Sequence, residues 1–183
     1  MKKWIFLLLL FPLTCVAQTY QYLGVEDGLS NRRVYCIQKD RTGYMWFLTH
    51  EGIDRYNGKD FKRYKLMDGD TEVNSLLNLN WLYIDRDGVL WEIGKKGKIF
   101  RYDEIHDRFE LVYKLPIENF RDLPAPVSFA WLDRNNHIWL CNEETIFLYN
   151  TATAQVCPIR NEIKEEITDI EQIDESHYFI GTE

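Results

Sequence analysis

The pattern DRTGYMW at residues 40–46 recurs along this chain at a regular spacing. It returns as DRDGVLW at residues 85–91 and as DRNNHIW at residues 133–139, and a diverged fourth copy begins at Asp174 and places Phe179 near the position of the tryptophan. The first residues of the four copies lie 45, 48 and 41 positions apart. A period of about 40–50 residues, with strand-like runs and one tryptophan in each unit, is typical of β-propeller blades.

Each unit divides into four short strands by its alternation of apolar and polar residues and by its turn residues. We therefore expect an all-β fold of about three and a half four-stranded antiparallel blades, which form an incomplete ring. In the first unit, Asn57-Gly58 predicts a type I′ hairpin turn, because that turn needs positive φ at both central residues. The predicted blades span residues 34–66, 80–115, 127–160 and, in part, 166–183; an N-terminal strand, at Tyr20 to Leu23, and a loop precede them at residues 18–33.

Trp46, Trp91 and Trp139 are expected on the second strand of their blades, where a large ring can fill the wedge between neighbouring blades. The aspartates of the same pattern have a structural role as well, since an aspartate in a turn accepts hydrogen bonds from its own turn backbone. The aromatic content of 15% is therefore attributed mainly to blade packing rather than to the stacking of sugar rings.

Residues 1–17 have the features of a secretory signal peptide. Met1-Lys2-Lys3 is a short basic region, and about ten apolar residues follow it, which suits a signal and is too short for a membrane span of about 20 residues. We expect cleavage after Ala17 and export to the periplasm. The alternative is a lipoprotein signal in which Cys15 carries the lipid.

The composition excludes several classes of protein. A net charge of −7 argues against nucleic-acid binding, which needs clustered lysine and arginine, and no stretch after the signal is apolar enough to span a membrane. Cys36, Cys141 and Cys157 remain after cleavage, so at least one is unpaired, and a Cys141–Cys157 bridge stays an alternative to free thiols. No Cys/His cluster has zinc-ligand spacing, and we expect no metal or cofactor.

A longer pattern surrounds the first copy and carries a family resemblance. It begins with EDGLSN at residues 26–31 and continues through Asp40, Gly43 and Trp46 to Asn57-Gly58 and Phe61. This pattern resembles the start of the two-component regulator propeller family, the extracytoplasmic sensor regions of hybrid two-component systems from polysaccharide-degrading Bacteroidetes. The resemblance extends over nearly the whole chain after the signal, although later repeats depart from it.

The resemblance implies a sensor of glycan or oligosaccharide breakdown products that passes its signal by a conformational change. It also implies further blades, a β-sandwich domain, a membrane helix, a histidine kinase core, and receiver and DNA-binding domains, none of which is visible in this sequence. The four histidines lie at turns or strand edges rather than in a phosphoacceptor helix: His50, His106, His137 and His177. We therefore expect no catalysis by this chain and interpret it as the N-terminal fragment of such a sensor.

Candidate ligand-binding residues lie in the loops between blades and in the turns between second and third strands, which share one face of a propeller. They are Arg32, Arg33, His50, Glu51, Lys95 and Lys96. Arg32-Arg33 is the main candidate for an anionic glycan, since arginine binds carboxylate or sulfate groups through two parallel hydrogen bonds. A solvated loop charge is the competing interpretation for each of the six.

Two other functions stay open. One is a protein-interaction scaffold or a non-functional truncated remnant; the other is a propeller lyase or hydrolase, which needs convergent acid, base or metal residues near the axis. Open blade faces expose strand edges and apolar surface. We therefore expect the chain to pair with further blades or a second chain, or to self-associate.

Overall fold

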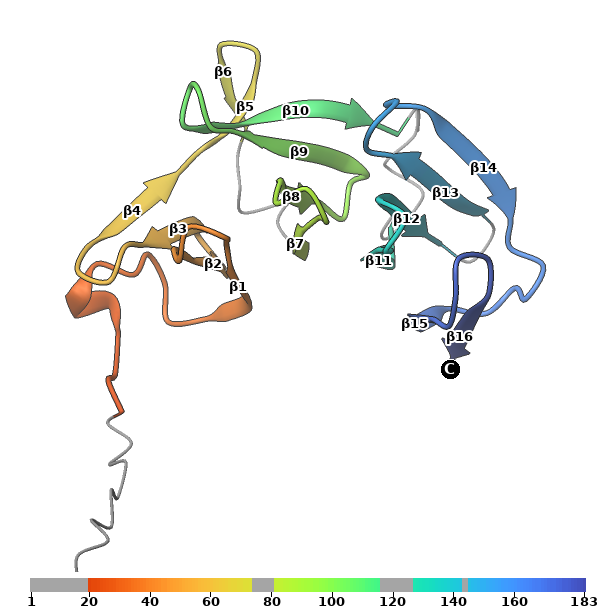
Figure 1. Ribbon diagram of the computed structural model, residues 1–183, viewed down its shortest axis with the longest axis horizontal. Coiled ribbons are helices and arrows are strands. Elements are labelled where there is room, and N and C mark those ends of the chain that lie inside the picture. Colours follow the sequence, from red (N-terminus) through yellow and green to blue (C-terminus); the bar gives the residue numbers. More distant parts are fainter. Residues whose placement is uncertain (1–19, 74–80, 116–126, 143–144) are drawn as a thin grey trace, which may run out of the picture.

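The computed structural model describes residues 20–73, 81–115, 127–142 and 145–183. Four sheets follow one another along an arc, and the first strand of each lies on its inner side (Figure 1). The all-β arrangement of propeller blades is confirmed, and the described sheets do not close into a ring. Within the described ranges, the only helix is the 3-10 turn η1, Val25–Asp27. No helix in this part of the chain is long and apolar enough to cross a membrane.

The strands are short and mostly antiparallel. The first sheet has the order β1 (Val34–Lys39), β2 (Met45–Thr49), β3 (Gly52–Tyr56), β4 (Phe61–Tyr64). The second contains β7 (Trp81–Ile84), β8 (Leu90–Ile93), β9 (Lys98–Asp103) and β10 (Arg108–Lys114), with β5 (Leu66–Asp68) and β6 (Thr71–Val73) beyond β10. The third contains β11 (Phe129–Leu132), β12 (His137–Cys141), β13 (Thr145–Asn150) and β14 (Val156–Arg160), and the fourth contains β15 (Ile167–Gln172) and β16 (Tyr178–Thr182).

The hairpin β5–β6 differs from the predicted four-stranded blade. β5 pairs in parallel with β10, Leu66 opposite Phe109 and Met67 opposite Glu110, so the second sheet has six strands. The sequence predicts that Leu66 ends the first blade and that a loop follows it, whereas this segment belongs to the second sheet. Burial of Leu66 in the core between the first two sheets stabilises this arrangement.

The N-terminal strand expected at Tyr20 to Leu23 does not form. The chain turns just after it, because Asp27 Oδ2 accepts a hydrogen bond from Gly24 N at 2.8 Å and Gly28 adopts a φ of 107°. A left-handed φ costs glycine little. The turn places Leu29 in a buried position and leaves Tyr20 exposed.

Ser30 then attaches this N-terminal loop to the first blade. Its backbone N and its Oγ donate to Asp54 Oδ2 at 2.9 and 2.5 Å, and its Oγ also lies 2.8 Å from Thr49 Oγ1. Asp54 is fully buried on β3, and this burial raises the pKa of its carboxyl group despite the bonds from Ser30.

The turn at Asn57-Gly58 is not type I′. Only Gly58 has a positive φ, of 95°. Asn57 Oδ1 accepts hydrogen bonds from the backbone N of Lys59 and of Asp60, at 2.8 and 2.7 Å. The asparagine side chain therefore stabilises a longer loop between β3 and β4.

Each tryptophan of the repeat lies in the core between its own sheet and the next. The partner rings from the next sheet are Tyr102 for Trp46, Tyr149 for Trp91 and Tyr178 for Trp139, with centroid separations of 4.9, 6.1 and 4.8 Å. Phe179, at the corresponding place in the fourth sheet, is 70% exposed.

The three described cysteines are free, so the Cys141–Cys157 bridge is not formed. Cys141 lies opposite Ile146 and Cys157 lies opposite Leu148, in neighbouring strand pairs of the third sheet. Burial raises the pKa of the Cys141 thiol to about 12. The predicted signal peptide, with Cys15, lies outside the described residues.

Candidate ligand-binding site

One aspartate at the start of the repeat fixes both a turn and a tryptophan. Asp40 Oδ1 accepts hydrogen bonds from the backbone N of Thr42 and of Tyr44 at 2.9 and 3.0 Å, while Oδ2 accepts one from Trp46 Nε1 at 2.7 Å. Burial alone would raise the pKa of Asp40, but a hydrogen bond from the Thr42 hydroxyl at 2.6 Å, together with those from Trp46 and the turn amides, outweighs it and lowers the pKa. The carboxylate therefore stays ionised where the turn and the blade core meet.

The next two copies repeat this geometry. Asp85 Oδ2 accepts from Trp91 Nε1 at 2.8 Å, and Asp133 Oδ2 accepts from Trp139 Nε1 at 3.1 Å. The fourth copy has no tryptophan for its aspartate to bind and retains only the hydrogen bonds within the turn. Asp174 Oδ1 accepts from the backbone N of Ser176 and of His177, at 2.9 and 3.0 Å.

These turns also contact one another along one face of the arc. Arg41 in the first turn donates from Nη1 to the carbonyl of Asp87 in the second at 2.9 Å, and from Nη2 to the carbonyl of Arg86. Asn136 in the third turn donates from Nδ2 to Asp87 Oδ2 at 3.1 Å. A displacement of one turn would therefore be transmitted through these hydrogen bonds to the turn of the next blade.

Arg55 on β3 joins the first blade to the second. Its Nη1 lies 3.5 Å from Asp107 Oδ1, in the turn between β9 and β10, and donates to the hydroxyl of Tyr102 at 3.1 Å. Its guanidinium carbon lies 4.5 Å from the centre of the Tyr44 ring, which is cation–π geometry.

Asp107 is the acceptor at the centre of this contact. It also accepts hydrogen bonds from Lys62, from Tyr102 and, at 2.7 Å, from the Tyr64 hydroxyl. Burial would raise the pKa of Asp107, but the bonds from Lys62, Tyr102 and Tyr64 and the charge of Arg55 lower it to about 2. Burial and the bond to Asp107 raise the pKa of Tyr102 to about 12, so its hydroxyl stays a neutral donor.

A cleft of about 390 Å³ lies over this contact, between the first and second blades, and we call it the blade 1–2 cleft. Aromatic rings and charged groups share its wall. Its lining includes Arg41, Tyr44, Arg55, Asp87, Tyr102 and Glu104.

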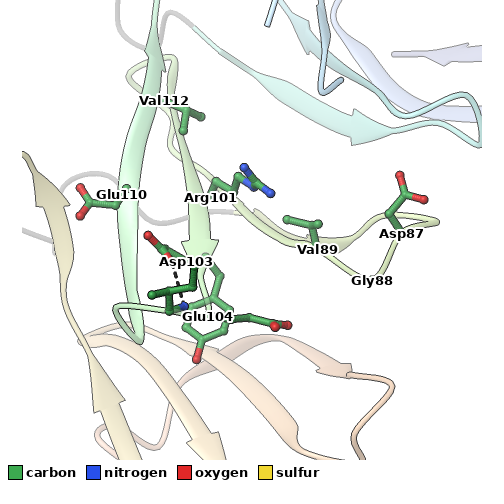
Figure 2. A pocket seen from close by; sticks show the side chains of 10 residues that line it. Asp87, Gly88, Val89, Arg101, Asp103, Glu104, Glu110 and Val112 are labelled. Atoms are coloured by element: carbon green, nitrogen blue, oxygen red, sulfur yellow. Dashed lines mark hydrogen bonds between the residues drawn. The ribbon is translucent and has the colours of Figure 1, made fainter. Parts of the chain in front are cut away.

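A larger pocket of about 630 Å³ lies on the second blade, and we call it the blade-2 pocket. The turn before β8 supplies Asp87 and Val89, β9 supplies Arg101 and Asp103, and the turn between β9 and β10, with β10 itself, completes the lining. Figure 2 shows Arg101 extending from β9 toward the turn that carries Asp87 and Val89.

Three of the predicted ligand residues gather in the first blade. The backbone N of His50 donates to the carbonyl of Arg33 at 3.0 Å. Glu51 Oε1 accepts from Asn31 Nδ2 at 3.2 Å, and its Oε2 lies 3.7 Å from Arg63 Nη1. The side chain of Arg33 is exposed at this point of the surface.

The other three predicted residues lie apart from that group or point elsewhere. Arg32 forms an exposed ion pair with Glu26 at 3.2 Å. Lys95 and Lys96 lie in the turn between β8 and β9 of the second blade, and no contact among the described residues joins them to Arg32 or Arg33. Ligand binding by the six residues stays a prediction.

The blade 1–2 cleft and the blade-2 pocket lie on the opposite face from those six residues. In an antiparallel blade, the turns after the first and third strands emerge at one end, and the turn after the second strand emerges at the other. The sequence pattern alone does not indicate Arg55, Arg101 or Asp107 as site residues. One signal was present, because Arg-Tyr occurs at residues 55–56 and again at residues 101–102, in the third strand of each blade.

Three of the histidines lie against an aspartate of their own turn. His106 Nδ1 is 2.7 Å from Asp103 Oδ2, and His137 and His177 contact Asp133 and Asp174 in a similar way. In the part of the chain that the structure describes, no group of three or more His, Cys, Asp or Glu residues could hold a metal ion.

Residues 28–51 match the family model described as two component regulator propeller. The matched segment runs from the N-terminal loop through β1 and β2. The match confirms the resemblance seen in the sequence, and it covers residues with defined contacts in the structure, among them Gly28, Ser30, Asp40 and Trp46. The two component regulator propeller repeat thus includes both the anchor of the N-terminal loop and the first Asp–Trp pair.

Solved structures provide similar folds. The extracellular domain of BT3049, described as a hybrid two component system from B. thetaiotaomicron, is 22% identical with a TM-score of 0.66, over 88% of this chain and 24% of that one. A catalytically inactive virginiamycin B lyase from Staphylococcus aureus, with quinupristin, is 16% identical with a TM-score of 0.54, over 74% of this chain and 43% of the lyase.

At these identities the likeness concerns the fold alone. The chain spans about a quarter of the length of the first of these structures. No curated protein sequence matches it.

Proposed function

We propose that this chain is part of the ligand-sensing propeller of an exported two-component signalling protein. Its ligands are oligosaccharides released by the breakdown of glycans, and it binds them without catalysing a reaction. The match of residues 28–51 to the two component regulator propeller carries this proposal. The fold shared with an extracellular domain of a hybrid two component system supports it.

The blade 1–2 cleft supports a role in ligand binding. Ligand sites combine apolar and aromatic walls with a few polar groups that fix orientation. Tyr44 and Tyr102 supply aromatic wall, while Arg55 and Glu104 supply polar groups of both signs. This lining suits a hydroxyl-rich ligand of modest charge.

The linked turns support a route for the signal. A ligand in the blade 1–2 cleft would contact Arg41 and Asp87, which also connect the first two blades. Asn136 continues the connection to the third blade. Ligand binding at the cleft would therefore favour one relative arrangement of neighbouring blades over another.

The test is made in the cell that produces the protein. An in-frame deletion of the codons for residues 20–183 is expected to abolish the transcriptional response to the oligosaccharide that induces it. Replacement of the exposed Lys59 by alanine, K59A, is the control and leaves the response intact. A normal response in the deletion strain would contradict the proposal.

The absence of catalysis has its own test. The full chain is incubated with the inducing oligosaccharide, and the products are separated by chromatography. We expect the oligosaccharide to be recovered intact. Cleavage would favour the lyase or hydrolase alternative instead.

A further inference from the structure

Arg101 on β9 occupies the same position in the second blade as Arg55 on β3 in the first. Arg55 lies opposite Trp46 in the strand ladder, and Arg101 lies opposite Trp91. The guanidinium of Arg101 is 6.0 Å from the centre of the Trp91 ring, and that of Arg55 is 5.3 Å from the Trp46 ring. The two blades therefore present the same side chain to their next neighbour.

The turn that faces this arginine differs between the two interfaces. In the second blade the turn begins at Asp103 and reaches Asp107, which has a φ of 50° and pairs with Arg55. In the third blade the matching turn begins at Asn150 and reaches Ala154, which has a φ of 56°. Ala154 thus stands where Asp107 stands, and it has no carboxylate to offer Arg101.

Two of the carboxylates around Arg101 pair with other groups. Asp103 pairs with His106 at 2.7 Å, and Glu110 pairs with Arg108. Among the described residues, Arg101 forms no ion pair. Its guanidinium therefore lines the blade-2 pocket with free hydrogen-bond donors.

We propose that Arg101 binds the carboxylate of an acidic sugar in the blade-2 pocket. The inference rests on the proposed function and assigns a site and a ligand class to it. The ligand carboxylate would take the position that Asp107 occupies beside Arg55, with two parallel hydrogen bonds from the planar guanidinium. Asp103 and Glu104 would accept hydrogen bonds from the sugar hydroxyl groups.

The acidic lining also limits the charge of the ligand. Asp87, Asp103, Glu104 and Glu110 surround a single arginine in this pocket. Like charges brought together in a protein site repel one another. The pocket therefore suits a sugar with one carboxylate better than a heavily sulfated one.

The experiment is a calorimetric titration of the full chain with a uronic-acid disaccharide. The disaccharide carries a single carboxylate, and the matched ligand is the same disaccharide with that carboxylate reduced to an alcohol. The variants are R101A, which removes the guanidinium, and A154D, which supplies the third blade with the missing carboxylate. Aspartate tolerates positive φ better than alanine, so A154D is expected to fold normally, and the melting temperature of each variant checks this.

We expect R101A and A154D each to weaken binding of the uronic-acid disaccharide by about tenfold or more, as the loss of a charged hydrogen-bonded pair does. The control variant K59A, at an exposed lysine outside the pocket, keeps the affinity, while the double variant R32A/R33A tests the competing site on the opposite face. Binding by R101A within twofold of the natural chain would overturn the inference, and so would equal affinity for the reduced disaccharide. If R32A/R33A alone loses binding, the Arg101 site is wrong while the proposed sensing function remains.

Discussion

Trp46 and Asp40 lie six residues apart in the chain, and the indole Nε1 of the first is 2.7 Å from the carboxylate Oδ2 of the second. The same carboxylate accepts the amides of the turn between β1 and β2 through its Oδ1. One side chain therefore couples the turn at the face of the blade to the ring in the core between blades. The spacing that recurs in the sequence reflects this coupling.

Replacement of Asp40 by alanine, D40A, should lower the free energy of unfolding by about 2–3 kcal/mol. The buried indole N–H and two turn amides lose their acceptor, and unsatisfied buried groups of this kind are costly. Urea unfolding followed by tryptophan fluorescence measures the change. D174A is the matched control, because Asp174 stabilises an exposed turn without a tryptophan, and we expect a clearly smaller loss. Equal losses in the two variants would show that the indole contact contributes nothing.

Acid should weaken the contact between the first two blades. The pKa of Asp107, about 2, is below its ordinary value, so the folded state favours the ionised carboxylate. This contribution to stability is complete above pH about 4 and is lost as the pH falls toward 2. The measurement is the free energy of unfolding of the natural chain and of D107N across this range. We expect the difference between them to shrink toward pH 2, and a difference that stays constant would contradict the assignment.

Gly97 should tolerate no side chain. Its φ is 68°, and a Cβ placed there would lie 2.4 Å from Leu115 Cδ1. We expect G97A to destabilise the chain by more than about 2 kcal/mol, from backbone strain and overpacking together. G58A is the control, because Gly58 has a φ of 95° but open space around it, so that alanine adds backbone strain without a steric clash. We expect G58A to lower the free energy of unfolding by about 1 kcal/mol. Thermal unfolding of both variants compares them, and a smaller effect for G97A would refute the role of the Leu115 contact.

The isolated chain should self-associate. Ile37 on β1 is 52% exposed and Phe179 on β16 is 70% exposed, so apolar side chains lie open on strands at both ends of the arc. Sedimentation velocity over a range of concentrations should show species larger than a monomer, and F179D should reduce them. A single monomer peak at every concentration would rule this out.

The local part of the fold could be predicted from the sequence, because the turn aspartate and the tryptophan act within six residues of one another. Pairings between distant segments could not. The strand at Leu66–Asp68 exists because β10 lies beside it, and nothing within the segment itself indicates a parallel partner. At Asn57 the side chain hydrogen bonds favoured a longer loop over the predicted turn.

The candidate site was harder to predict for a similar reason. Arg55 and Asp107 belong to different blades, and their contact depends on how the two sheets pack. The Arg-Tyr pairs at residues 55–56 and 101–102 indicate equivalent positions. Only the structure shows that Asp107 pairs with Arg55. It also shows that Ala154 occupies the equivalent position in the turn that faces Arg101.

The most direct test of the account is an equilibrium titration of the full chain with a panel of neutral and acidic oligosaccharides, followed by product analysis of the same samples. We predict saturable binding of at least one oligosaccharide, which is then recovered intact. Absence of saturable binding across the panel, or cleavage of the bound oligosaccharide, would contradict a non-catalytic ligand-sensing propeller.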